Sequence, residues 1–166
     1  MSNLYQWIVW LHVLAAFVFL FSHGAELATA FLLPKENDAN GMKALLNITK
    51  ITLIPFGVST LLLLITSVYM GVTAGWWKKG WWELSFLIMV AMWAWMQWYA
   101  RKYYSPIRKA LGVEYMTGSS THNPPEVPES MDVVYALIAK TNPRLLAGAG
   151  LSFTAILLFL MRFKPF

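Results

Sequence analysis

The chain has 166 residues, of which 58% are hydrophobic and only 13% are charged, and it contains no cysteine. Soluble domains carry roughly 45–50% apolar and about 25% charged residues, so this composition belongs to the membrane class. The absence of cysteine excludes disulfides, thiolate metal sites, covalently attached c-type haem and cysteine nucleophiles. The formal net charge is +5. Its basic residues stand beside apolar segments, where they orient the chain and contact lipid head groups, so we expect no nucleic-acid partner.

The first apolar segment covers residues 5–33, more than the ~20 residues that cross a bilayer. The residues before it lack the basic start of a signal peptide, so we expect a membrane helix that Pro34 ends. A second span is predicted over 42–74, with Pro55 inside it. A turn rich in Trp and Lys over 75–80 then leads to a third span over 81–104.

A polar region separates the third span from a fourth, which is predicted over 143–162. Ser105 and Pro106 have the residue types of an N-cap and first helical position, so they predict the start of a short basic helix. Residues 112–130 read as irregular, and Ser130 is placed to cap a short amphipathic helix on the membrane surface. The predicted fold is all-α: one membrane domain over 1–166, a four-helix bundle with a loop over 105–142.

Four spans place both termini on one side of the membrane, and the basic residues predict which side. That side has four basic residues and the other has nine: Lys35, Lys43, Lys50, Arg101, Lys102, Arg108, Lys109, Lys140 and Arg144. Cytoplasmic loops carry the excess of Lys and Arg. The loop over 105–142 is therefore predicted to be cytoplasmic and both termini extracytoplasmic, in a multi-pass protein of the cell (inner) membrane.

The first span carries three ionisable residues on one stripe. At ~3.6 residues per turn, the stripe consists of His12, Ala16, Phe19, His23, Glu26, Leu27 and Ala30. Ionisable side chains inside a bilayer normally face the interior of a helix bundle. The two histidines are about 16 Å apart along the helix axis, at ~1.5 Å per residue. The stripe is therefore predicted to be a buried face with two separate layers.

The other spans offer neighbours for both layers. The second span has a seam of Thr52, Ser59, Thr66 and Thr73 with Met70 alongside, the third has Val90, Ala94, Gln97 and Arg101, and the fourth has Gly148, Ser152 and Ala155. Counting from the helix ends, we expect a polar interior layer of Glu26, Gln97 and Ser152 around His23, and an outer layer of His12, Thr66 and Met70. Lys50 has the depth to pair with Glu26, although an ideal helix points it away.

Two histidines at this spacing on one membrane helix could each supply an axial ligand to a separate haem b. His12, His23 and Met70 are the candidate cofactor-binding residues, and the remaining histidine, His122, falls in the loop. Two alternatives stay open: a buried His23–Glu26 hydrogen bond without any cofactor, and a metal or small-solute site whose further ligands the sequence does not define.

The motif Leu11-His12-Val13-Leu14-Ala15-Ala16, followed by a Ser/Thr-containing second span and a Trp-rich third, resembles four-helix bacterial proteins related to the copper-resistance D (CopD-like) membrane domain. The resemblance implies haem or copper contact through a membrane histidine, and it maps onto His12.

These observations predict an integral membrane subunit that binds haem b and is associated with a membrane electron-transfer complex. The alternatives are a non-catalytic accessory or scaffold subunit of a larger membrane complex, and a copper or small-solute transport component. Expected partners are the lipid bilayer and other membrane subunits or further copies of the chain. No nucleophile triad, phosphate loop or paired carboxylates are present, so we do not expect an enzyme on its own.

Overall fold

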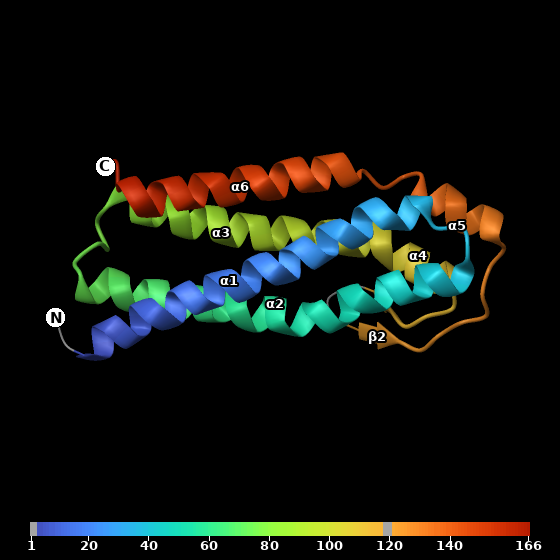
Figure 1. The fold of residues 1–166 in the computed structure, drawn as a ribbon, viewed down its shortest axis with the longest axis horizontal. Coiled ribbons are helices and arrows are strands. Elements are labelled where there is room, and N and C mark those ends of the chain that lie inside the picture. Colours follow the sequence, from blue (N-terminus) through green and yellow to red (C-terminus); the bar gives the residue numbers. More distant parts are fainter. Residues whose placement is uncertain (1–2, 118–120) are drawn as a thin grey trace.

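The computed structural model describes residues 3–117 and 121–166, which form an elongated helical bundle (Figure 1). Its long helices are α1 (Asn3–Leu32), α2 (Ala39–Thr73), α3 (Gly80–Tyr99) and α6 (Pro143–Phe163). Helix α1 packs along α2, α3 packs on α6, and α1 also contacts α6. Both termini lie at one end of the bundle together with the α2–α3 turn, and the short elements gather at the other end. We call these the terminal end and the loop end.

The loop end contains η1 (Leu33–Lys35), the π-helical turn η2 (Ala100–Tyr104), α4 (Ser105–Ala110) and α5 (Met131–Ile138). It also contains a short hairpin of β1 (Tyr115–Thr117) and β2 (Thr121–Asn123), antiparallel with Met116 opposite His122. The sequence predicted this stretch to be irregular, and the hairpin is the difference. Three-residue strands are too short to leave a clear alternation of apolar and polar residues.

Local sequence explains where the long helices begin and end. Asp38 caps α2 by accepting a hydrogen bond from the N–H of Gly41 at 2.9 Å. Asn142 caps α6 in the same way, accepting from the N–H of Leu145 at 3.0 Å, with Pro143 in the first turn. The long α1 passes into a 3₁₀ turn that contains Pro34. The predicted helices are thus confirmed, with ends that shift by a few residues.

The prediction that Ser105 caps a separate helix is wrong, because helical structure continues from α3 through η2 into α4. Ser105 itself has helical backbone angles. Pro106 lacks an N–H and crowds the preceding turn of an α-helix, and the wider π turn over Ala100–Tyr104 lies directly before it. The Ser105 hydroxyl contacts the carbonyl of Met116 and accepts from the Met116 N–H at 3.0 Å, which ties α4 to β1.

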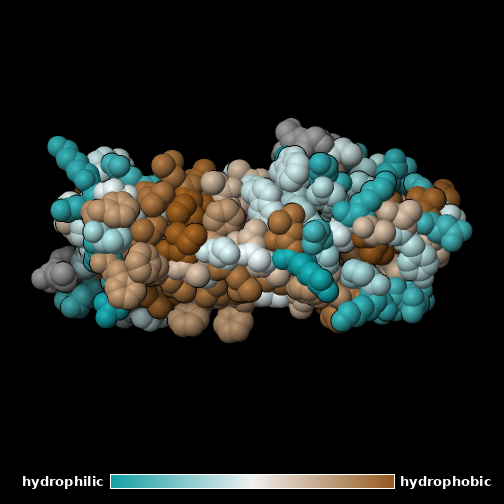
Figure 2. All heavy atoms as spheres, turned by 90° about the horizontal axis from the view of Figure 1, so that it is seen from above, coloured by the Kyte–Doolittle hydropathy of each residue, from teal (hydrophilic) through white to brown (hydrophobic). Residues whose placement is uncertain are grey.

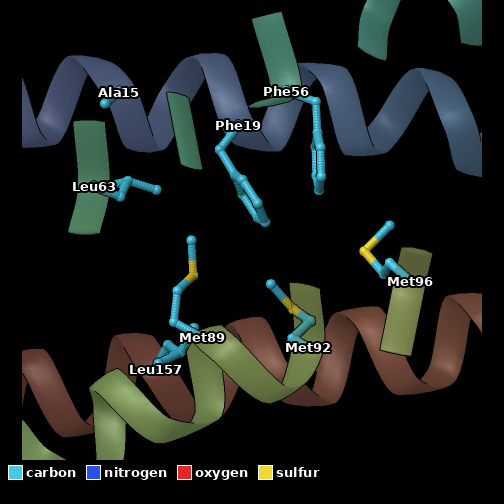
Figure 3. Close-up of a cluster of buried hydrophobic side chains, with 8 residues drawn as sticks. All are labelled: Ala15, Phe19, Phe56, Leu63, Met89, Met92, Met96 and Leu157. Atoms are coloured by element: carbon cyan, nitrogen blue, oxygen red, sulfur yellow. The ribbon is translucent and has the colours of Figure 1, made fainter. Parts of the chain in front are cut away.

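The central core lies between the α1–α2 pair and the α3–α6 pair. Figure 3 shows its side chains pointing toward one another: Ala15, Phe19, Phe56, Leu63, Met89, Met92, Met96 and Leu157. The rings of Phe19 and Phe56 stack with their centroids 4.9 Å apart. Flexible methionines from α3 fill the irregular space that these rings leave. The methionines of α3 therefore serve as core residues.

The surface has the apolar belt of a membrane protein. Within the described residues, three helical stretches are long and apolar enough to cross a membrane: Asn3–Lys35, Ala39–Thr73 and Met131–Phe163. Figure 2 shows apolar surface over much of the half nearer the terminal end, with hydrophilic surface at both ends. Helix α3 has 20 residues and packs within the same bundle, but it is not among the three.

The turn rich in Trp and Lys over 75–80 lies at the terminal end, where tryptophans pack together. Trp76 packs against Trp81 with centroids 5.2 Å apart, and Lys164 lies 4.0 Å above the Trp76 ring. The indole N–H of Trp82 donates to the Ser67 carbonyl at 3.2 Å. Amphipathic rings with a nearby cation suit the boundary between lipid and water.

Candidate functional site

The predicted stripe of α1 does face the interior of the bundle. Phe19, His23 and Ala30 are buried, and His12 and Glu26 are half-buried. The neighbouring seam of α2 is also confirmed in its central part, where Ser59, Thr66 and Met70 are buried. Its two ends differ, because Thr52 is only half-buried and Thr73 is exposed.

His12 is joined to the α2 seam by a hydrogen bond between its Nδ1 and the Thr66 hydroxyl, at 2.7 Å. The Thr66 hydroxyl donates its one proton to the Leu62 carbonyl at 2.6 Å. Its oxygen must then accept from the Nδ1–H of His12, which leaves the lone pair of the neutral imidazole on Nε2. The outer layer therefore holds His12 in one tautomer. Met70 lies one helical turn beyond Thr66 and is buried.

His23 lies in a tight apolar enclosure. Both of its ring nitrogens are buried and have no hydrogen-bond partner among the described residues. The ring stacks on Phe19 with centroids 6.3 Å apart. Gly150 of α6 lies close to the Nε2 side of the ring, where an added Cβ would clash with Nε2 of His23. The predicted His23–Glu26 hydrogen bond is not formed, and the imidazole instead fills the contact between α1 and α6.

This geometry does not fit a haem on His23. Neither cavity described below borders His23 or His12. The backbone of Gly150 occupies the space beside Nε2 of His23. His12 differs, because its Nε2 is not among the enclosed ring nitrogens. The side chain of His122 lies outside the described residues. Among those that are described, no group of three or more His, Asp or Glu residues is arranged to hold a metal ion.

Helices α3 and α6 present different faces to the interior than the sequence predicted. On α3 the buried residues are Trp81, Trp82, Ser85, Met89, Met92, Met96 and Tyr99. Val90, in contrast, is 39% exposed, and Ala94 is exposed. On α6 the buried residues are Leu146, Gly150, Leu157 and Leu160. Gly148, Ser152 and Ala155 lie on the exposed side. Ser152 therefore does not join the polar interior layer, and Gly150 provides the close helix contact.

Glu26 and Gln97 are brought together at the wall of one cavity of about 190 Å³. We call it the bundle cavity. Its lining comes from the four long helices, the η2–α4 segment and the chain around β1. The lining residues are Glu26, Thr49, Lys50, Leu53, Phe56, Met96, Gln97, Tyr99, Ala100, Arg101, Tyr104, Ser105, Arg108, Glu114, Met116 and Leu146. These two residues belong to the predicted inner polar layer, and the structure places a cavity beside them.

The bundle cavity changes from apolar to charged along its length. Leu53, Phe56 and Met96 line its deeper part, toward the middle of the bundle, and the cations Lys50 and Arg108 line the part toward the loop end. Lys50 and Phe56 are six residues apart on α2, or about 9 Å along the axis at ~1.5 Å per residue. The cavity therefore has an apolar end and a charged end, which matches the two parts of an amphipathic molecule.

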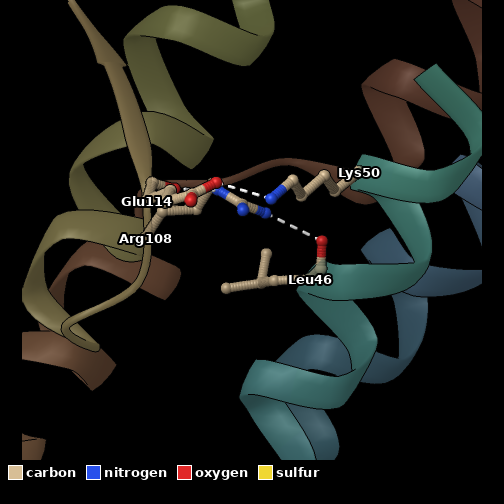
Figure 4. Close-up of polar contacts among 4 residues, drawn as sticks. All are labelled: Leu46, Lys50, Arg108 and Glu114. Atoms are coloured by element: carbon tan, nitrogen blue, oxygen red, sulfur yellow. Dashed lines mark hydrogen bonds and ion pairs between the residues drawn. The ribbon is translucent and has the colours of Figure 1, made fainter. Parts of the chain in front are cut away.

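The Lys50 side chain pairs with Glu114, so the pairing with Glu26 that the sequence left open is not formed. Lys50 Nζ lies 2.5 Å from Glu114 Oε2, and both side chains are about half exposed, at 50% and 48%. Figure 4 shows Lys50 reaching from α2 to Glu114, with Arg108 beside them. Glu114 follows α4 and lies 64 residues away in sequence. That separation leaves no signal from which sequence could predict the pair.

Arg108 connects α4 to α2 and to its own loop. Its Nη1 donates to the Leu46 carbonyl at 2.8 Å, and its Nε donates to the Glu114 carbonyl at 2.7 Å (Figure 4). Burial lowers the pKa of the Arg108 guanidinium, and the nearby Glu114 carboxylate opposes that effect. The basic short helix predicted from Arg108 and Lys109 thus has a structural role at the cavity.

A second cavity of about 390 Å³ lies on the loop side of these residues. We call it the loop cavity. It is lined by Lys43, Ala44, Asn47, Lys50, Arg108, Gly112, Val113, Glu114 and Pro125. Lys50, Arg108 and Glu114 border both cavities.

Comparison of the chain with protein-family models, with curated proteins and with solved structures gives no match.

Proposed function

We propose that this chain is an integral membrane protein that binds a small amphipathic molecule in the bundle cavity. The observation that carries the proposal is the cavity itself, about 190 Å³, whose walls pass from apolar side chains to cations. Ligand sites are mostly apolar hollows with a few polar groups that orient the ligand. Glu26 and Gln97 are such groups, set among Phe56, Met96 and Leu146. This function develops the small-solute alternative from the sequence.

The membrane arrangement that supports this proposal has α1, α2, α3 and α6 as four spans. Helix α3 is long enough, because 20 residues at ~1.5 Å each cover ~30 Å of hydrocarbon. Both termini lie at the same end of the bundle (Figure 1). With nine basic residues predicted at the loop end, that end is cytoplasmic and the termini are extracytoplasmic. The bundle cavity then opens at the cytoplasmic boundary of an inner-membrane protein.

Filling the cavity tests the proposed function. Leu53 lines the bundle cavity and is 39% exposed, whereas the next residue, Ile54, is 73% exposed and lines neither cavity. The variant Leu53→Trp is expected to abolish binding of 1-octanol to the protein in phosphatidylcholine nanodiscs. Ile54→Trp adds the same indole on the outer surface and is expected to leave binding unchanged. Equal binding by the two variants would contradict the proposal.

A second candidate function is haem b binding through His12, as in a subunit of an electron-transfer complex. The Thr66 hydrogen bond favours it, because histidines that bind metals usually donate their other ring N–H to a fixed acceptor. His12 would ligate the iron through Nε2, and the haem would supply one-electron chemistry. A reduced-minus-oxidised visible spectrum of the purified protein tests this function. A haem band lost in His12→Ala and kept in His23→Ala would support it, and no band would exclude it.

A further inference from the structure

The bundle cavity and the loop cavity share one wall, made by Lys50, Arg108 and Glu114. The wall consists of two side chains from helices and one residue of the segment before β1. The Lys50–Glu114 ion pair, 2.5 Å long, closes it, and the two hydrogen bonds of Arg108 fix its edge (Figure 4). Breaking this ion pair would therefore connect the bundle cavity, which is partly apolar, with the polar loop cavity.

The charges around the loop cavity are mostly positive. Lys43, Lys50 and Arg108 line it together with one carboxylate, that of Glu114. Arg101 and Glu26 also line the bundle cavity. The cations Lys50 and Arg108 lie at the loop end of the bundle cavity, away from the apolar side chains that line its deeper part. This distribution complements a negatively charged group attached to an apolar chain.

The two cations of the wall are held in different ways. Arg108 donates to two backbone carbonyls, and these hydrogen bonds fix its position. Lys50 is half exposed and is paired with a half-exposed carboxylate. Ion pairs of this exposure contribute little to stability, so another anion can replace Glu114 on Lys50 at little cost.

We propose that the bundle cavity takes a single-chain anionic amphiphile, with its carboxylate or phosphate head on Lys50 in exchange for Glu114. The apolar chain then lies along Leu53, Phe56 and Met96, and the head faces the loop cavity. This inference rests on the proposed function and adds the charge class of the ligand. Charge complementarity at the shared wall is what favours an anion over a neutral or cationic head.

Four amphiphiles with the same eight-carbon chain separate the possibilities: octanoate, octyl phosphate, 1-octanol and octyltrimethylammonium. Their affinities are measured by calorimetry with the full chain in phosphatidylcholine nanodiscs, after subtraction of empty nanodiscs. We expect the two anions to bind at least tenfold more tightly than 1-octanol, and the cation to bind most weakly. The tighter of the two anions identifies the head group as a carboxylate or a phosphate.

Two wall variants and one matched control assign the effect to Lys50. Lys50→Met is expected to reduce the affinity of both anions to that of 1-octanol while leaving 1-octanol unchanged. Glu114→Gln is expected to raise the affinity for anions, a gain that a folding defect would not produce. Lys102 lies over the Trp98 ring and lines neither cavity, so Lys102→Met is expected to change nothing.

The outcomes distinguish this inference from the proposed function. Equal affinities of the wild-type chain for 1-octanol and both anions would overturn the anionic assignment and leave the cavity as the binding site. Anion selectivity that persists in Lys50→Met would also overturn it. Absence of binding by all four amphiphiles would overturn both the inference and the proposed function.

Discussion

Gly150 of α6 lies directly against the imidazole of His23 on α1, where an added Cβ would clash with Nε2. The contact joins the α1–α2 pair to the α3–α6 pair. The ring nitrogens of His23 have no hydrogen-bond partner among the described residues. The close approach of α6 at Gly150 encloses the ring and holds it inside the bundle.

We predict that Gly150→Ala destabilises the bundle by about 1–3 kcal/mol, the usual cost of overpacking. Gly148 provides the control, because an added Cβ there meets nothing within 4 Å, and Gly148→Ala should be neutral or stabilising. Thermal unfolding in detergent measures both. The cost of Gly150→Ala should fall in a His23→Ala background, because the clashing ring is gone. A cost that does not depend on His23 would refute the contact.

The outer layer makes a separate prediction about the tautomer of His12. The Thr66 hydroxyl accepts from Nδ1, so the neutral imidazole should carry its proton there. Thr66→Val keeps the shape of the side chain and removes the acceptor, at an expected cost of about 0.5–1.5 kcal/mol. Nitrogen chemical shifts of the labelled imidazole measure the tautomer. A proton on Nε2 in the wild-type chain would show that the hydrogen bond runs in the other direction.

Glu126 makes the stability of the loop end depend on pH. Tyr115 donates a hydrogen bond to its carboxylate and Lys109 lies 3.3 Å away, and these contacts lower its pKa below the ordinary 4.5. Because the folded pKa is the lower one, the contribution is present above pH 4.5 and is lost as the pH falls through the folded value.

Glu126→Gln removes this pH-dependent contribution. Its midpoint of thermal unfolding should lie below that of the wild-type chain at neutral pH, and the difference should shrink well below pH 4.5. A constant difference between Glu126→Gln and the wild type at all pH values would contradict the assignment.

The predicted orientation can be read with single cysteines, because the natural chain has none. Lys164→Cys places a thiol at the terminal end, and Val127→Cys places one in the loop, where Val127 is 88% exposed. A membrane-impermeant maleimide should label Lys164→Cys in intact cells. It should label Val127→Cys only after permeabilisation. The opposite pattern would reverse the orientation.

The sequence predicted α1 more accurately than α3 or α6, for a physical reason. On α1, three ionisable residues mark one face, and the cost of exposing them to lipid fixes which way the helix turns. On α3 the choice rested on Gln97, yet nearly every side of this helix is apolar, and the packing of Met89, Met92 and Met96 decided its rotation. On α6 the prediction rested on Ser152, which is exposed, whereas Leu146, Gly150, Leu157 and Leu160 are buried.

The cavities could not be predicted from the sequence, because their walls combine residues that are distant along the chain. The Lys50–Glu114 pair spans 64 residues and depends on how the loop folds back onto α2. Glu26 and Gln97 were predicted as neighbours from their depth alone, and both line the bundle cavity. Counting residues from the helix ends therefore placed these two residues at one cavity, whereas it did not give the direction of the Lys50 and Ser152 side chains.

The central claim, a ligand site in the bundle cavity, is tested most directly by photolabelling. An eight-carbon diazirine amphiphile is bound to the protein in nanodiscs, activated by light, and its attachment sites are mapped by mass spectrometry. We predict labelling at Leu53, Phe56 or Met96 that excess octanoate suppresses, while labelling at the outward-facing Ile54 is unaffected by octanoate. Labelling confined to outward-facing positions, or unaffected by competitor at every site, would contradict the claim.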